Sequence, residues 1–176
     1  MKGGQQSPQE ILNSGKIYEE QREYGKAVDR YMQITESHFQ NKDQLEEIWN
    51  NAFNIAMNYA KDKVNDVVSV LGQRLLNIGK FESAAEIFES VALYDKAIDA
   101  FVEVKKWDRA MECAQQVRPM EMQQILVQKI NQKKKDSYIA SNKIGKIVEA
   151  GDLSGLELLA QEGRWEECLQ FAEKQD

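Results

Sequence analysis

Proline and glycine are scarce in this sequence. The 176 residues include only two prolines and ten glycines, so long stretches of Glu, Lys, Ala, Gln, Leu and Met contain no residue that breaks a helix. Hydrophobic residues make up 42% of the chain and charged residues 30%, which is usual for an ordered protein. The composition predicts an all-α fold that forms one domain or one segment of a longer array.

Long apolar runs and an excess of basic residues are also missing. No stretch approaches the roughly 18 consecutive apolar residues of a membrane span, and the opening MKGGQQSPQE lacks the apolar run of a signal peptide. The net charge of −6 argues against a nucleic-acid partner, which usually meets a basic face. We interpret residues 1–6 as a flexible leader or cloning remnant, and residues 7–176 as a helical solenoid excised from a longer chain.

Residues suited to catalysis or metal binding are few and poorly placed. His38 is the only histidine and lies in a polar linker, where we expect a solvated side chain; a His-rich metal site is therefore excluded. Cys113 and Cys168 form no CxxC pair and are interpreted as small core residues in a reducing compartment. Adjacent carboxylates such as Glu166 and Glu167 diverge by about 100° on a helix. We predict no catalytic residue, cofactor or metal, and an enzyme is the least favoured function.

Signals for helix starts and ends recur along the chain. Ser7 and Pro8 mark the start of the first helix, with Glu10 placed to complete a capping box, and a second helix follows residues 23–25. Glycine follows several expected helix ends. We expect about eleven helices and no strand. Two helices occupy residues 45–60 and 66–78, and three short ones lie within residues 80–117. The remaining helices occupy residues 119–135, 137–150, 152–162 and 165–176.

The stretch KFESAAEIFESVALYDKAIDAFVEVKKWDRAMECAQQV, residues 80–117, repeats an aromatic residue three positions before an alanine every thirteen residues. This interval suits one three-turn helix and a tight turn. We expect each aromatic residue to sit in the turn and pack over the helix start, and each alanine to let two helices approach closely. The pairs are Phe81/Ala84, Tyr94/Ala97 and Trp107/Ala110, and Trp165/Cys168 repeats them with cysteine in place of alanine.

Two segments match part of the tetratricopeptide pattern W-x2-L-G-x2-Y … A-x3-F. The matching residues are Gly15, Tyr18, Ala27 and Tyr31 in the first segment, and Leu71, Gly72, Ala84 and Phe88 in the second. Glycine and alanine are twelve residues apart in both. The aromatic residue four positions after the alanine, which is Phe101 in the next copy, is expected to fill the gap between units. We predict an α-solenoid of antiparallel, tetratricopeptide-like helix pairs in which these residues are packing positions.

The segment QKINQKKKD holds the candidate partner-binding residues, which are Lys129, Lys133, Lys134 and Lys135. Lysines in the last turn of a helix stabilise its negative dipole end, which is one interpretation. The other is a patch for an acidic partner or an anionic membrane surface. No aromatic residue is interleaved with the lysines, which disfavours single-stranded nucleic acid.

Three blocks in this order resemble a known family: SPQEILNSGKIYEEQREYGKAVDRYMQIT, IGKFESAAEIF…LYDKAIDAFVEVKKWDRAMECA and EGRWEECLQFAEKQ. They are similar to the C-terminal tetratricopeptide-like solenoid in the family of the largest subunit of intraflagellar transport complex B. The resemblance covers residues 7–175. The shared positions are packing positions, so no site residue of the family carries over.

The resemblance implies a non-enzymatic scaffold at the cilium or flagellum and its base, on the cytoplasmic side. Such a scaffold would help to assemble transport trains for cilium assembly and maintenance, and would contact complex B subunits and complex A. Two alternatives remain open. One is a vesicle-coat or membrane-associated adaptor that binds anionic surfaces through the lysines, and the other is a chaperone co-factor that grips an acidic tail.

Overall fold

The computed structural model describes residues 6–174, and these form eleven α-helices, one 3-10 helix and no strand. The chain divides into two compact units, the first ending at Gln116 and the second beginning at Val117. The prediction of an all-α chain built from packed helix pairs is confirmed. Of the expected leader, residues 1–5 lie outside the described part. None of the described helices is both long and apolar enough to cross a membrane.

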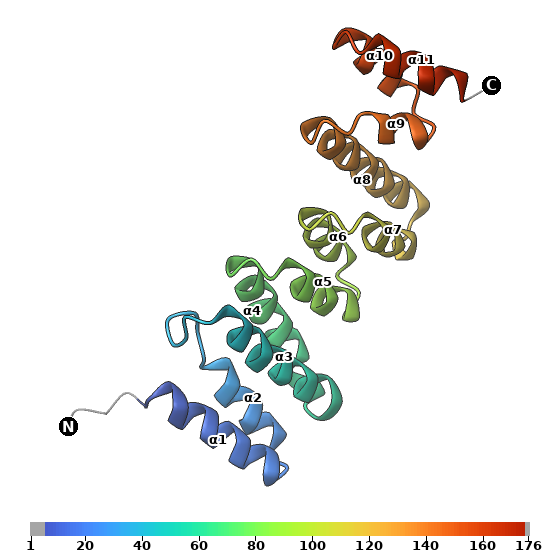
Figure 1. The fold of residues 1–176 in the computed structure, drawn as a ribbon. Coiled ribbons are helices and arrows are strands. Elements are labelled where there is room, and N and C mark those ends of the chain that lie inside the picture. The colour runs from blue at the N-terminus through green and yellow to red at the C-terminus, as the bar shows by residue number, and fades with distance from the viewer. Residues whose placement is uncertain (1–5, 175–176) are drawn as a thin grey trace. The chain divides into compact units, whose positions relative to one another are not determined.

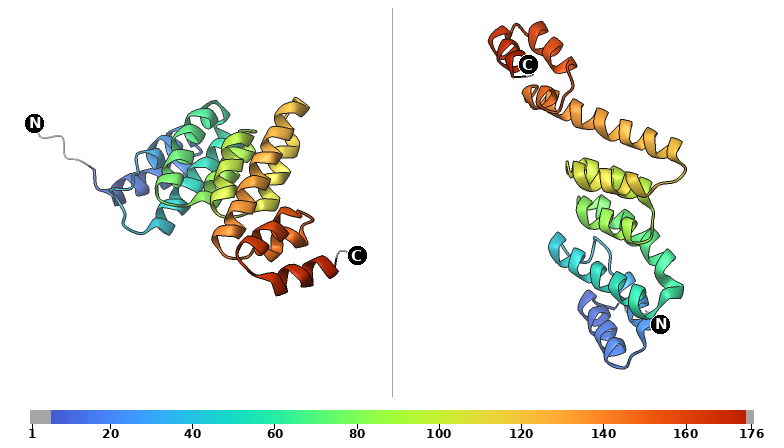
Figure 2. Two further views of the ribbon diagram at one scale, coloured as in Figure 1. Left: turned by 90° about the horizontal axis from the view of Figure 1, so that it is seen from above. Right: turned by 90° about the vertical axis from the view of Figure 1, so that its right-hand side faces the viewer.

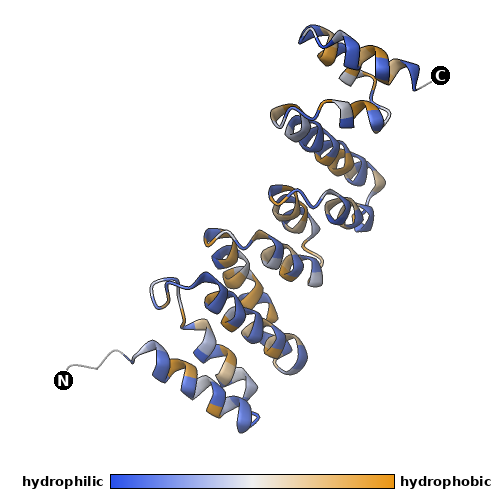
Figure 3. Ribbon diagram, in the orientation of Figure 1, coloured by the Kyte–Doolittle hydropathy of each residue, from blue (hydrophilic) through white to orange (hydrophobic). Residues whose placement is uncertain are grey.

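In the first unit, each helix packs against the next one along the chain (Figure 1). Figure 3 shows hydrophobic and hydrophilic residues mixed around each helix, as expected for helices with one buried side. The short 3-10 helix Lys61–Lys63 joins the third and fourth helices. The helices are α1 (Pro8–Glu20), α2 (Tyr24–Met32), α3 (Lys42–Tyr59), α4 (Val64–Asn77), α5 (Phe81–Ser90), α6 (Tyr94–Glu103) and α7 (Trp107–Gln116).

The second unit contains one long helix followed by three short ones. They are α8 (Met120–Ala140), golden in Figure 2, α9 (Gly145–Glu149), α10 (Ser154–Gln161) and α11 (Trp165–Glu173). Its core is formed by Ile144, Ile147, Val148 and Leu159. Side chains from α8, α10 and α11 pack against this core, among them Tyr138 and Phe171.

Helix starts and ends follow from local chemistry. The capping box predicted at Ser7 is present: its hydroxyl accepts a hydrogen bond from the Glu10 backbone N–H at 3.3 Å, and the Glu10 carboxylate accepts one from the Ser7 N–H at 2.7 Å. Most turns contain one residue with positive φ, after which a backbone N–H donates to a carbonyl five residues earlier. The positive-φ residues are Arg22, Gly79, Ala92, Lys105, Asn142, Gly151 and Gly163.

The thirteen-residue interval has a direct structural origin. Helices α5, α6 and α7 each contain ten residues, and a three-residue turn separates each from the next. Each aromatic residue of the repeat is the first residue of its helix, and not a turn residue as expected. The alanine three positions later is fully buried in every copy, at Ala84, Ala97 and Ala110. Tyr24 and Ala27 form one further pair at the start of α2, which the sequence analysis missed.

Glycine allows an aromatic ring to lie directly against a neighbouring helix at two equivalent places. A Cβ atom on Gly72 of α4 would lie 2.3 Å from Cε1 of Phe88, and one on Gly15 of α1 would lie 2.7 Å from Cε1 of Tyr31. In both cases the ring follows the glycine by sixteen residues. The ring therefore fills space inside a helix pair, whereas the sequence analysis placed it between successive units.

The expected helix boundary near residue 137 is wrong. Helix α8 continues without a break to Ala140, and α9 covers only Gly145–Glu149 instead of 137–150. No glycine or proline interrupts KKKDSYIA, so the helix continues to Ala140. The turn that follows contains Asn142, a residue type that tolerates a positive φ. Lys133, Lys134 and Lys135 are therefore not in the last turn of a helix, and the dipole interpretation does not apply to them.

Replacing Gly72 with alanine should destabilise the first unit. Alanine favours a helix interior by about 1 kcal/mol over glycine, but the new methyl group would overlap the Phe88 ring, and overpacking typically costs about 1–3 kcal/mol. We expect urea unfolding to show a lower free energy of unfolding for Gly72→Ala. The matched control is Gly25→Ala, where the methyl would meet only the flexible end of the Lys63 side chain. Equal stability of the two variants would contradict this account.

The positive-φ turns give a second prediction: substitutions at two of these residues should shift the urea midpoint in opposite directions. Ala92 has φ of 60°, a conformation that costs a non-glycine residue about 1 kcal/mol. Ala92→Gly should therefore raise the urea midpoint. The gain in stability is reduced because glycine adds conformational entropy to the unfolded chain. Gly79→Ala should lower the midpoint, because φ is 83° and no atom lies near the new methyl. Shifts of the same sign would show that turn strain does not control stability here.

Candidate functional site

The residues of the repeat mainly pack helices together. Phe81, Tyr94 and Trp107 are half-buried at the starts of their helices. The last copy differs, because Trp165 is 61% exposed, while Cys168 is half-buried and its Sγ lies 3.6 Å from the carbonyl oxygen of Leu156. Residues that could contact a partner must therefore be sought among the exposed polar side chains.

Polar side chains in the first unit mostly bridge neighbouring helices. Arg74 donates to the carbonyl oxygens of Met32 at 2.9 Å and Ile34 at 3.0 Å, at the end of α2. Trp49 Nε1 donates to the same Ile34 carbonyl at 3.0 Å. Contrary to expectation, His38 is half-buried, and its Nδ1 accepts a hydrogen bond from the Thr35 backbone N–H at 3.1 Å. These groups hold the α2–α3 connection and the start of α3 in place.

A shallow pocket of about 410 Å³ lies beside Lys80 at the start of α5. Three acidic residues line it, Glu46, Glu82 and Glu86. The Lys80 ammonium group pairs with Asp43 and, at 2.6 Å, with Glu46. Because its cation already has two carboxylate partners inside the unit, this pocket offers little to an incoming anion.

The thiol of Cys113 is buried inside the first unit. Burial raises the pKa of the Cys113 thiol to about 12, so this group is protonated at neutral pH and is a poor nucleophile. Among residues 6–174, no group of three or more His, Cys, Asp or Glu side chains could hold a metal ion. The Glu19 carboxylate accepts a hydrogen bond from the Tyr31 hydroxyl, which gives it a structural role.

The four candidate lysines do not share one face of α8. At about 100° per residue, Lys129 and Lys133 lie on one side, whereas Lys134 and Lys135 point in two further directions. The structure therefore separates the lysines that are consecutive in the sequence. Lys134 and Lys135 reach a pocket between α8 and α9, and Lys129 and Lys133 are not among the residues that line it.

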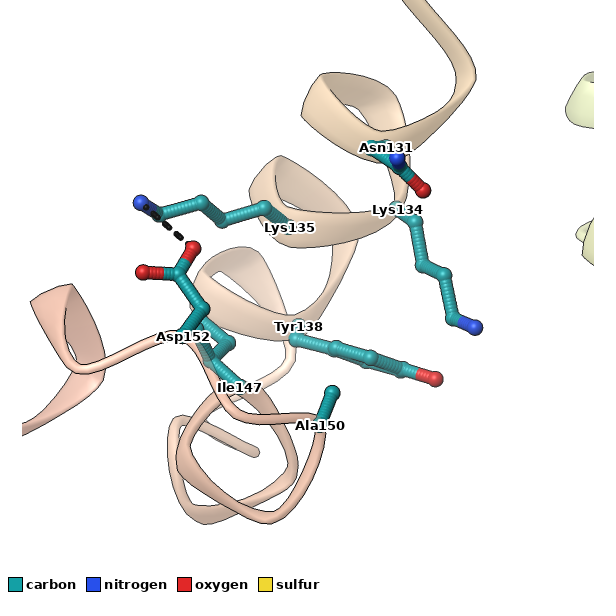
Figure 4. Close-up of a pocket in the computed structure, with 7 residues that line it drawn as sticks. All are labelled: Asn131, Lys134, Lys135, Tyr138, Ile147, Ala150 and Asp152. Atoms are coloured by element: carbon teal, nitrogen blue, oxygen red, sulfur yellow. Dashed lines mark ion pairs between the residues drawn. The ribbon is translucent and has the colours of Figure 1, made fainter. Parts of the chain in front are cut away.

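This pocket has a volume of about 260 Å³ and lies entirely within the second unit (Figure 4). Its lining residues are Asn131, Lys134, Lys135, Tyr138, Ile147, Ala150 and Asp152. In Figure 4, Lys135 points towards Asp152, while Lys134 extends to the other side, next to Tyr138. The Lys146 ammonium group adds a further cation, 5.9 Å from the centre of the Tyr138 ring.

Asp152 fixes one wall of the pocket. Its carboxylate accepts hydrogen bonds from the backbone N–H of Ser154 at 3.0 Å and from the Ser154 hydroxyl at 2.6 Å. The Lys135 ammonium group lies 3.1 Å from the same carboxylate and also contacts the Ser154 hydroxyl. The Ser154 hydroxyl and Lys135 together hold the pKa of Asp152 below its ordinary value. Sequence reasoning missed this site, although the Lys134–Tyr138 spacing of four residues places both on one helix side.

This chain has several relatives among known proteins. No family model matches it. Intraflagellar transport protein 172 of Chlamydomonas reinhardtii is 33% identical over 88 residues, or 50% of this chain. The homologues of Danio rerio and Homo sapiens are 29% identical over 167 residues and 27% over 176 residues, or 94% and 99% of the chain.

Nearly the whole chain is similar to intraflagellar transport protein 172. The resemblance inferred from the three sequence blocks is thereby confirmed. The chain spans at most 10% of the length of these relatives. The name intraflagellar transport protein 172 states a process and no ligand, so the chemistry of the pocket has to be derived from its own contacts.

The Asp152 contacts predict a measurable titration. Because the folded-state pKa lies below the unfolded value, the Asp152 contacts stabilise the fold at neutral pH, and this stabilisation is lost as the pH falls below about 4. Ser154→Ala and Lys135→Met should each raise the pKa of Asp152, as read from its carboxyl ¹³C shift across a pH titration. An unchanged pKa in both variants would show that neither group holds the carboxylate.

Proposed function

We propose that this chain is a non-catalytic scaffold segment of an intraflagellar transport protein that acts in a cilium or flagellum. Its exposed helix faces bind other transport subunits, including those of complex B and, through this part of the solenoid, complex A. In this way it helps to assemble the trains that cilium assembly and maintenance require. Similarity to intraflagellar transport protein 172 over 94–99% of the chain supports this role.

One structural observation carries the proposal. The small residues that repeat along the first unit are fully buried between helices, at Ala27, Ala84, Ala97 and Ala110. A repeat with its signature residues inside forms a continuous core and leaves the residues between them on the surface. Such surfaces suit contacts with several different protein partners.

The alternative of an adaptor on anionic membranes receives less support from the geometry. Such an adaptor needs several cations gathered on one face, where each contributes near the surface. Helix α8 instead spreads its four lysines around its circumference, and Lys135 is paired with Asp152. We therefore favour protein partners.

Affinity purification of the tagged chain from ciliated cells tests the proposal. The chain should enrich transport subunits, and so should Glu103→Ala, which changes an exposed residue of α6. Ala97→Trp should lose this enrichment, because overpacking at a fully buried position typically costs about 1–3 kcal/mol. Circular dichroism identifies the folded samples. A folded chain that enriches no transport subunit would overturn the proposal.

A further inference from the structure

We propose that the pocket between α8 and α9 is a binding site for an acidic peptide segment of a partner protein. Lys134 receives a carboxylate of the peptide, and the neighbouring apolar side chain of the peptide rests on the pocket floor. The inference rests on the interaction role proposed above and identifies one place where a partner binds.

The dimensions of the pocket suit a side chain of a partner. Its volume of about 260 Å³ lies below the range of roughly 300–1,000 Å³ found for pockets that hold small molecules. Residues of α8, of α9 and of the α9–α10 turn line this open pocket. The contacts of Asp152 with Ser154 and Lys135 fix the wall on the side of the turn.

The charge of the pocket favours an anion. Lys135 already has Asp152 as a partner, and among the described residues that line the pocket Asp152 is the only acidic one. Lys134 and Lys146 make no ion pair with any residue of the described part of the chain. The Lys134 ammonium group therefore remains available in the pocket, in a chain whose net charge is −6, and the Lys146 ammonium group lies 5.9 Å from the centre of the Tyr138 ring. The Asn131 side-chain amide and the Tyr138 hydroxyl are neutral donors that can also donate hydrogen bonds to an incoming carboxylate.

The apolar groups indicate that the anion belongs to a peptide. Ile147 and Ala150 form the floor of the pocket together with the Tyr138 ring. Ala150 lies on the exposed side of these groups, so an apolar side chain of a partner can reach them. A bare phosphate or a lipid headgroup would leave these groups without a contact. An acidic side chain next to an apolar one satisfies both parts of the site.

The test is fluorescence anisotropy with a labelled peptide of alternating Glu and Leu, compared with the same peptide in which Gln replaces Glu. We expect the full chain to bind the Glu peptide, and Lys134→Met to weaken binding on the order of ten-fold, as loss of one charge-assisted hydrogen bond implies. Lys133→Met is the matched control, since it removes the same charge from the adjacent exposed residue. It should change the affinity less than two-fold.

Several outcomes would overturn the inference. They are equal binding of the Gln peptide, equal losses in Lys133→Met and Lys134→Met, or no binding to a folded chain. Flotation with vesicles of phosphatidylcholine and phosphatidylserine that depends on Lys134, without peptide binding, would assign the site to a membrane instead. If the chain enriches transport subunits but no peptide binds, this inference fails and the proposed function stands.

Discussion

Reversing a helical chain within three residues requires a backbone conformation that most side chains resist. Seven turns of the described chain contain one residue at positive φ, which is glycine in three of them and Arg22, Ala92, Lys105 or Asn142 in the other four. A hydrogen bond then returns to the carbonyl five residues earlier, as from Leu93 to Phe88 at 2.9 Å. Between α5 and α7 each such turn is three residues long, so a ten-residue helix and its turn repeat every thirteen residues. The interval in the sequence is a consequence of the turn.

Short turns also force consecutive helices close together, and this explains which residues the packing positions carry. Glycine inside a helix costs about 1 kcal/mol relative to alanine. At Gly72 this cost is offset, because the Phe88 ring occupies the space that a methyl group would take. Full burial of a phenylalanine contributes about 1.5–3 kcal/mol, so the exchange favours the glycine. Tyr31 repeats the arrangement against Gly15, with its hydroxyl directed to Glu19.

The sequence predicted those features that depend on neighbours along the chain. The capping box at Ser7, the buried alanines and the helical content all arise from local patterns. The break expected near residue 137 was wrong because nothing in KKKDSYIA distinguishes a helix interior from a helix end. Asn142 marks the true end, but asparagine adopts positive φ only in some contexts.

The candidate site illustrates the same limit at longer range. Four lysines within seven residues suggested one patch, yet the helix phase sends them in different directions. Asp152 comes from a turn seventeen residues after Lys135, and only the folded unit brings the two together. Sequence spacing predicts which residues share a helix face, and it cannot show which side chains meet across α8, α9 and α10.

A small cationic pocket in an acidic chain has a consequence for selectivity. The net charge of −6 repels acidic peptides from most of the surface. At physiological ionic strength, charges more than about 8 Å apart are largely screened, so attraction is confined to the cations that border the pocket. Lys134, which lines the pocket, can then attract a carboxylate locally. Salt should weaken such a contact, because the cations lie at the rim of the pocket and remain open to solvent.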